Sequence, residues 1–137
     1  MEIANKEKEY YDSDHLVYSC QYHVVFCPKY RRKIFKSPYD EALKKKFYRI
    51  AEEYKFSIPE LEIMPEYVHM IIDCNPKFGV YECVKKLKMT TATEMRDEFP
   101  ELKSRLPTLW TRASFISSIG SVSLDSIHQY IESQKNK

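Results

Sequence analysis

Glycine, paired cysteines and long apolar runs are all scarce in this sequence. Only two of its 137 residues are glycine, which excludes glycine-rich phosphate loops and the Rossmann fingerprint, because both need several glycines at fixed spacing. No apolar run approaches the roughly 20 residues of a membrane-spanning helix, and the charged segment 1–14 does not resemble a signal peptide. These absences remove nucleotide-cofactor enzymes and membrane-spanning proteins from the expected classes.

The four cysteines, Cys20, Cys27, Cys74 and Cys83, form no C-x-x-C pair. Three of them lie within apolar segments, which is typical of small buried side chains. We therefore expect free buried thiols in a reducing cytoplasm rather than a zinc site or a disulfide framework.

Neither sign of charge dominates the composition. There are 22 Lys and Arg against 20 Asp and Glu, a net charge of +2 that is too small to indicate a nucleic-acid-binding protein by itself. The content of 43% hydrophobic and 14% aromatic residues, including eleven tyrosines, is enough to build a core. We expect a flexible arm over 1–14 and a single domain over 15–137.

Hydrophobic periodicity predicts an α+β fold. Apolar residues alternate along segment 16–27, as in a half-buried strand, and recur at helical spacing after Pro38. The pattern continues with strands at 56–64 and 67–74, a helix at 80–99, a strand at 108–119, and a helix at 124–134 capped by Ser123. This order predicts a ferredoxin-like βαββαβ antiparallel sheet with an appended C-terminal helix. Such sheets serve many functions, so function depends on the sites.

Two polar pairs stand out against this pattern. Tyr67 and His69 lie two residues apart on one strand and so share its polar face. By itself, this histidine is a metal ligand, a phosphate contact or a solvated residue. Tyr130 and Gln134 lie one turn apart on the last helix, within a stripe that periodicity alone explains by packing.

Four motifs in order give these pairs a context. They are YHVVFCPKYRR at 22–32, MPEYVH at 64–69, LWTR at 109–112 and YIESQ at 130–134. Together they resemble the single-tyrosine transposases of small insertion sequences, the TnpA type of the HUH nucleases. The resemblance extends over 18–134, nearly the whole chain.

The resemblance implies a transposase that binds hairpin ends of an insertion sequence and cuts and rejoins single-stranded DNA. A helix tyrosine forms a 5′-phosphotyrosine, and two strand histidines with a helix glutamine hold Mg²⁺ or Mn²⁺. By position, Tyr130 matches the nucleophile, and His69 and Gln134 match two metal ligands. The resemblance also implies a homodimer, with which a long edge strand at 108–119 is compatible.

One position departs from the family pattern. Tyr67 stands where the first motif histidine belongs, and a phenol must lose its proton to bind a metal well, unlike neutral imidazole. Three interpretations remain open: a disabled metal site in a protein that only binds hairpin DNA, a site assembled from His69, Gln134 and water, or an active lineage that tolerates the substitution. His23, on a neighbouring strand, is a weak candidate for a replacement ligand.

A basic loop at 29–36 is the candidate DNA contact. It has five basic residues and no acid, so it would engage phosphates, and Tyr30 would stack on an unpaired base. The alternative is a solvated loop. The predicted DNA-binding residues are Lys29, Tyr30, Arg31, Arg32, Lys33 and Arg112, with Lys85, Lys86 and Lys88 as secondary candidates. An RNA-binding module on the same fold is disfavoured because its paired aromatic sheet motif is missing.

Overall fold

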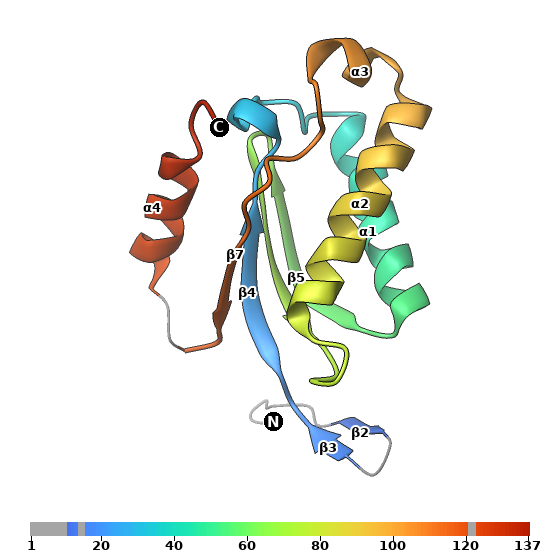
Figure 1. Cartoon of the computed structure of the whole chain (residues 1–137), viewed down its shortest axis with the longest axis vertical. Coiled ribbons are helices and arrows are strands. Elements are labelled where there is room, and N and C mark those ends of the chain that lie inside the picture. Colours follow the sequence, from blue (N-terminus) through green and yellow to red (C-terminus); the bar gives the residue numbers. More distant parts are fainter. Residues whose placement is uncertain (1–10, 14–15, 121–122) are drawn as a thin grey trace.

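A four-stranded antiparallel sheet forms the centre of the molecule, seen here in a computed structural model that describes residues 11–13, 16–120 and 123–137. Helices α1 and α2 cover one face, and α4 lies on the opposite face (Figure 1). The strand order is β5-β6-β4-β7. In chain order the elements are β2 (Tyr11–Ser13), β3 (Leu16–Tyr18), β4 (Gln21–Phe26), the 3-10 turn η1 (Lys29–Arg31), α1 (Tyr39–Tyr54), β5 (Ser57–Met64), β6 (Tyr67–Asp73), α2 (Val80–Glu98), α3 (Glu101–Arg105), β7 (Phe115–Ser118) and α4 (Leu124–Ser133). The predicted fold class is confirmed.

The two central strands, β4 and β6, present side chains to both faces of the sheet. Val24 pairs with Met70 and Val25 pairs with His69. Because side chains alternate along a strand, Val24 and Met70 enter the core under α1 and α2, whereas Val25 and His69 face α4. Val24, Val25 and Met70 are fully buried, so both faces of these strands are covered.

Helices α1 and α2 bury the stripes that their sequences predict. In α1, Leu43, Phe47 and Ile50 are fully buried, each contributing roughly 1.5–3 kcal/mol by leaving water. The helix starts with acidic residues in its first turn, which suit the helix dipole. It ends where Lys55 adopts a left-handed conformation with φ 62°.

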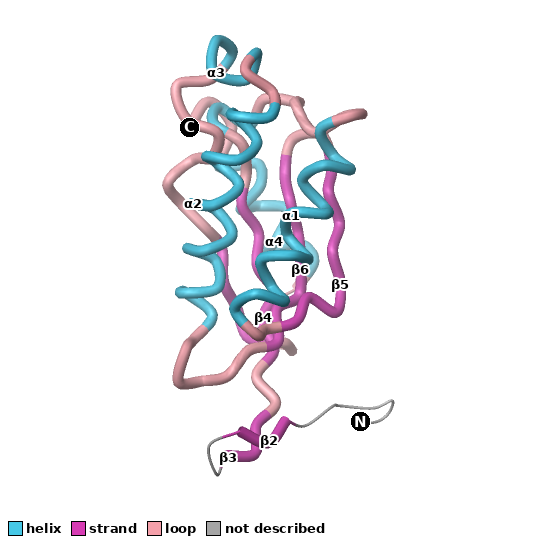
Figure 2. Tube along the Cα trace, turned by 90° about the vertical axis from the view of Figure 1, so that its right-hand side faces the viewer, coloured by secondary structure: helices cyan, strands magenta, loops and turns pink. Residues whose placement is uncertain are grey.

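The first predicted strand is interrupted. Segment 16–27 divides at residues 19–20 into β3 and β4, and β3 pairs with β2 in a hairpin beyond the end of the main sheet (Figure 2). Of the arm expected at 1–14, only Tyr11–Ser13 lie within the described residues, where they form β2. The rest of that expectation lies outside the described residues.

The strand expected at 108–119 was too long. Only Phe115–Ser118 form β7, and the turn α3 precedes it. The Lys88 ammonium donates hydrogen bonds to the carbonyl oxygens of Thr111 at 2.8 Å and Ala113 at 3.0 Å. Before these residues the segment still pairs with the chain after β4, because Trp110 forms an isolated antiparallel bridge with Pro28 and the Thr111 backbone N–H donates to the Cys27 carbonyl oxygen at 3.0 Å. Strand pairing is lost only between this bridge and β7, where the side chain of Lys88 takes the carbonyl oxygens instead.

The cysteines are free, with Cys27, Cys74 and Cys83 buried. Cys20 is partly exposed, contrary to the expectation of four buried thiols, because it follows β3 at the end of the sheet. Among the helices of the described residues, none combines the length and apolarity needed to cross a membrane.

Candidate active site

Helix α4 lies on the polar face of the sheet, carries Tyr130 and ends immediately before Gln134. Its first turn is capped by Ser123, whose Oγ accepts a hydrogen bond from the Ser126 backbone N–H at 3.2 Å. Ile127 and Ile131 pack on Val25 in a small core, separate from the main one, with Tyr67, Phe115 and Tyr130 around it. The predicted helix and its cap are confirmed, and its stripe packs as periodicity suggested.

Tyr130 has a buried hydroxyl group without a hydrogen-bond partner among the described residues. Its ring packs against Phe115 of β7, with ring centroids 5.4 Å apart. Burial raises the pKa of the Tyr130 phenol well above its ordinary value. The phenol is therefore protonated at neutral pH and needs help to act as a nucleophile.

Gln134, directly after α4, is only 4% exposed. Its Nε2 donates a hydrogen bond to the Ser133 Oγ at 3.3 Å, but its buried Oε1 has no partner within the described part of the chain. Unpartnered buried polar atoms are rare and call for a specific explanation. Two such atoms, the Tyr130 hydroxyl oxygen and the Gln134 Oε1, belong to residues at the C-terminal end of α4.

His69 is tied to His23 of the neighbouring strand. The His23 Nδ1 and the His69 Nε2 are 3.1 Å apart, and the ring centroids are 5.3 Å apart. This separation of the centroids means that the two nitrogens point nearly at each other, so the N–H of one ring donates a hydrogen bond to the lone pair of the other. Burial, followed by the nearby His23, lowers the pKa of His69 and favours its neutral form.

Tyr67 lies beside the small core under α4, on the strand face that the sequence predicts. Burial raises the pKa of its phenol, and the nearby carboxylates of Glu62 and Glu66 raise it further. Tyr67 is therefore a neutral phenol at physiological pH, the form least suited to bind a cation.

The donor set for a divalent cation is incomplete. The open Oε1 of Gln134 suits Mg²⁺ or Mn²⁺, which prefer oxygen ligands. However, the His69 Nε2 is engaged by His23, and position 67 offers a protonated phenol. Among the described residues, no three His, Cys, Asp or Glu side chains form a metal-binding group. The residues present do not fit the three-ligand site that the resemblance implies.

The basic loop contacts α4, a contact that no sequence pattern predicts. Arg31 donates hydrogen bonds to the Ile131 carbonyl oxygen at 3.3 Å and to the Glu132 Oε1 at 3.4 Å. Its side chain is only 16% exposed. Arg32 and Lys33 are exposed, and Lys29 lies over the Tyr30 ring at 5.2 Å. Arg31 therefore holds the end of the tyrosine-bearing helix, while its neighbours remain open to solvent.

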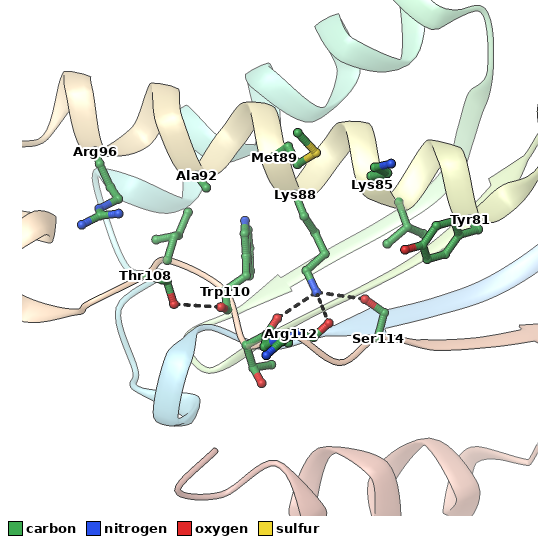
Figure 3. Close-up of a pocket in the computed structure, with 13 residues that line it drawn as sticks. Tyr81, Lys85, Lys88, Met89, Ala92, Arg96, Thr108, Trp110, Arg112 and Ser114 are labelled. Atoms are coloured by element: carbon green, nitrogen blue, oxygen red, sulfur yellow. Dashed lines mark hydrogen bonds between the residues drawn. The ribbon is translucent and has the colours of Figure 1, made fainter.

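Arg112 lies on the opposite side of the sheet from α4. It lines a hollow of about 400 Å³ between α2 and segment 108–114 (Figure 3). Lys88 extends into the same region, where it also donates a hydrogen bond to the Ser114 Oγ at 3.0 Å, and burial lowers its pKa to about 8. Lys88 thus fixes this segment, and its ammonium is already occupied by protein acceptors.

The comparison with known proteins agrees with this arrangement. The family model described as "Transposase IS200 like" matches residues 16–134, most of the chain. The chain belongs to the IS200-like transposase family. The ISDra2 transposase TnpA of Deinococcus radiodurans is 31% identical over 123 residues, which cover 88% of each chain. The transposase of the insertion sequence element IS200 from Salmonella typhimurium is 28% identical over 122 residues, covering 88% of this chain and 80% of that one.

A solved structure confirms the fold of this IS200-like transposase. A crystal structure of a candidate transposase from Deinococcus radiodurans R1 superposes with a TM-score of 0.84 at 29% identity, covering 93% of this chain and 99% of the other. The resemblance seen in the four sequence motifs is therefore confirmed as family membership. The roles of Tyr130, Gln134, His69 and Tyr67 remain predictions for this chain.

Proposed function

We propose that this protein binds single-stranded DNA with hairpin ends and cleaves and rejoins it through a 5′-phosphotyrosine at Tyr130. Membership of a transposase family supports DNA cleavage and rejoining as the activity. The observation that carries the assignment to Tyr130 is its buried hydroxyl on α4, which has no hydrogen-bond partner among the described residues and lies at the small core that Tyr67 also borders. A buried polar atom held without a partner suits a substrate-binding site.

The proposed step is a transesterification. The Tyr130 oxygen attacks the scissile phosphorus, a P–O bond forms, and the bond from phosphorus to the 3′ oxygen breaks. The phenolic proton is transferred in net to the departing 3′ oxygen, which becomes a hydroxyl group. Rejoining is the reverse step with another 3′ hydroxyl, and the phosphodiester bond is conserved throughout, so no external energy source is needed.

The protein's own groups have definite roles in this proposal. The small core of Val25, Ile127 and Ile131 docks α4, so that the nucleophile is oriented before DNA arrives. Burial and the nearby His23 lower the pKa of His69 and favour its neutral form, so it brings no positive charge to the site. The raised pKa of Tyr130 means that the phenol must be activated by a group that accepts its proton.

A second candidate function is hairpin DNA binding with impaired chemistry, and Tyr67 is the observation that favours it. The neutral phenol replaces an expected metal ligand, and the donor set is incomplete. We propose Mg²⁺ or Mn²⁺ as the cofactor of a site with histidine at position 67, held by that residue, His69 and Gln134. There it would supply Lewis-acid polarisation of the phosphate.

One experiment separates the two candidates. The wild type and the variants Tyr67→His, Tyr67→Phe and Tyr130→Phe are incubated with single-stranded insertion-sequence ends and Mn²⁺, and covalent protein–DNA adducts are counted on denaturing gels. A wild-type adduct supports the active transposase. An adduct from Tyr67→His alone, and not from Tyr67→Phe, supports the impaired relative. An adduct that persists in Tyr130→Phe contradicts the assignment of the nucleophile.

We also propose a homodimer. In the sheet order β5-β6-β4-β7, strand β7 is an edge strand, and open edges are available for pairing with a second chain. Strand β7 has four residues rather than the twelve expected, so its edge is shorter and supports a dimer less strongly than the expected strand would. Sedimentation equilibrium should show a dimer, and a monomer at all protein concentrations would contradict the proposal.

A further inference from the structure

A cationic hollow lies at the C-terminal end of α4. Its volume is about 380 Å³, and it is lined by Tyr30, Arg31, Arg32, Lys135 and Asn136. Three of these five residues are cations and none is an acid. Arg31 is neutralised in part by Glu132 at 3.4 Å, whereas Arg32 and Lys135 are exposed and form no ion pair within the described ranges 11–13, 16–120 and 123–137. The hollow therefore suits an anion.

The hollow also presents an aromatic ring. Tyr30 is 39% exposed, with the Lys29 Nζ 5.2 Å and the Arg32 Cζ 5.7 Å from its ring centroid. Rings placed among cations are the usual means by which proteins bind single strands, since bases stack on the ring while phosphates meet the charges. A duplex has its bases stacked internally and cannot use such a ring.

Backbone strain is concentrated in the same place. Tyr30 and Arg31, two consecutive non-glycine residues, adopt positive φ of 60° and 51°, and Asn136 across the hollow has φ 69°. Lys55, the other non-glycine residue with positive φ in the described chain, is explained by the end of α1. Such conformations cost of order 1 kcal/mol or more each and cluster at functional sites. Here they turn the Tyr30 ring and the Arg31 side chain toward different partners.

Two distant parts of the chain build the hollow together. The Tyr30 backbone N–H donates to the Lys137 carbonyl oxygen at 3.0 Å, and Arg31 binds the last turn of α4. In Figure 1 the C-terminal end lies beside the loop that contains η1. Lys135 follows Tyr130 by five residues, just beyond the end of α4 at Ser133. The hollow thus adjoins the end of the helix that carries the proposed nucleophile, so a strand held by Tyr130 can continue into it.

We propose that this hollow binds an unpaired nucleotide one or two positions from the scissile phosphate, with its base on the Tyr30 ring and its phosphate between Arg32 and Lys135. The proposal rests on the proposed function, because it takes Tyr130 as the nucleophile. It has a consequence for α4: a strand bound across the loop and Lys135 holds the helix in place, so DNA binding and helix docking stabilise each other by the same free energy.

The base-binding part is tested by equilibrium binding to Tyr130→Phe, which lacks the proposed nucleophile. The probes are an oligothymidylate of about 8 nucleotides, within usual single-strand site sizes of ~4–16, and an abasic phosphodiester oligomer of equal length. Tyr30→Asn removes the ring and keeps a residue that tolerates positive φ. It should weaken oligothymidylate binding about 5- to 100-fold and leave abasic binding nearly unchanged. Tyr48→Asn, at a similarly exposed tyrosine of α1, is the control, and equal effects of the two would overturn the proposal.

The phosphate-binding part is tested by salt dependence. Arg32→Ala and Lys135→Ala should each lower the slope of log K against log salt concentration by about 0.7, whereas Lys45→Ala on α1 should not. Unchanged slopes in the first two variants contradict a phosphate between them. Because neither measurement needs cleavage, these results stand whether or not the wild type forms a covalent adduct.

The position along the strand is tested by crosslinking. With the cleaved phosphate mapped in the adduct-forming protein, 5-iodouracil is placed at successive nucleotides on both sides of it. Crosslinks to Tyr30 should come only from one or two nucleotides away. Crosslinks from more distant positions alone overturn the placement while leaving Tyr130 as the nucleophile, and failure of the adduct assay overturns the proposed function instead.

Discussion

Replacing Arg31 with alanine tests whether the basic loop positions the tyrosine-bearing helix. Helix α4 buries only Ile127 and Ile131, whereas α1 buries four side chains in the main core. A helix with so few buried apolar contacts opens more readily than the rest of a fold. Arg31 adds hydrogen bonds to the Ile131 carbonyl oxygen and to Glu132, and so contributes to the free energy that keeps α4 closed.

The magnitude follows from these two contacts. Hydrogen bonds to charged groups contribute about 1.5–3 kcal/mol, and the 3.3 Å length of the Arg31 bond to Ile131 favours the low end. The exposed Glu132 partner, 72% accessible, adds between ~0 and 1 kcal/mol. Arg31→Ala should therefore lower the free energy needed to open α4 by about 1–2 kcal/mol. This raises the population of the open helix, and with it the amide exchange rate, about 5- to 30-fold.

Amide hydrogen exchange followed residue by residue is the assay. The α4 amides should exchange faster in Arg31→Ala, while those of β4 and β6 should keep their protection, because the main core is untouched. Arg32→Ala removes the same charge from an exposed neighbour without a bond to α4, so it should leave α4 unchanged. The reasoning is refuted if α4 exchange is unaffected, or if the sheet loses protection equally.

Two further substitutions test how segment 108–114 is held against α2. Lys88→Met leaves the acceptors of its ammonium unsatisfied and should lower the free energy of unfolding by about 2–3 kcal/mol in urea titrations, whereas Lys85→Met at an exposed site should change it by less than ~0.5. Thr91→Val keeps the side-chain shape but removes the acceptor of the Trp110 Nε1 hydrogen bond of 3.0 Å, which should cost about 1–3 kcal/mol; an equal loss in the exposed Thr93→Val would contradict this explanation.

The features that could be predicted from the sequence are those set by local periodicity. Alternation along β6 correctly predicted which face of the sheet carries Tyr67 and His69, because side chains on a strand alternate with a period of two whatever the strand pairs with. Helical spacing correctly predicted the apolar stripe of α4. Ser123 correctly predicted where the helix begins, because an N-cap depends on neighbouring residues alone. The tyrosine at position 67, in place of the expected histidine, was also evident from the sequence, since it is a change of residue type within a motif.

The features that could not be predicted depend on partners distant in the sequence. Segment 108–114 alternates like a strand, but it bridges the chain after β4 only at Trp110, and the side chain of Lys88 takes the carbonyl oxygens of residues 111–113. Arg31 lies in a run of basic residues that predicts a phosphate contact, yet its hydrogen-bond partners are about 100 residues away in the sequence, on α4. His23 was a candidate neighbour of His69, but its hydrogen bond to that residue depends on the pairing of β4 with β6.

Mapping the covalent adduct is the most direct test of the central claim that Tyr130 is the nucleophile. Trypsin cleavage after Arg112 and Lys135 releases peptide 113–135, which has Tyr130 as its single tyrosine. When wild type or Tyr67→His has reacted with single-stranded insertion-sequence ends, mass spectrometry should find this peptide carrying the nucleotide through a phosphotyrosine. An adduct located on another peptide, such as the one that contains Tyr67 on the facing strand, would contradict the account.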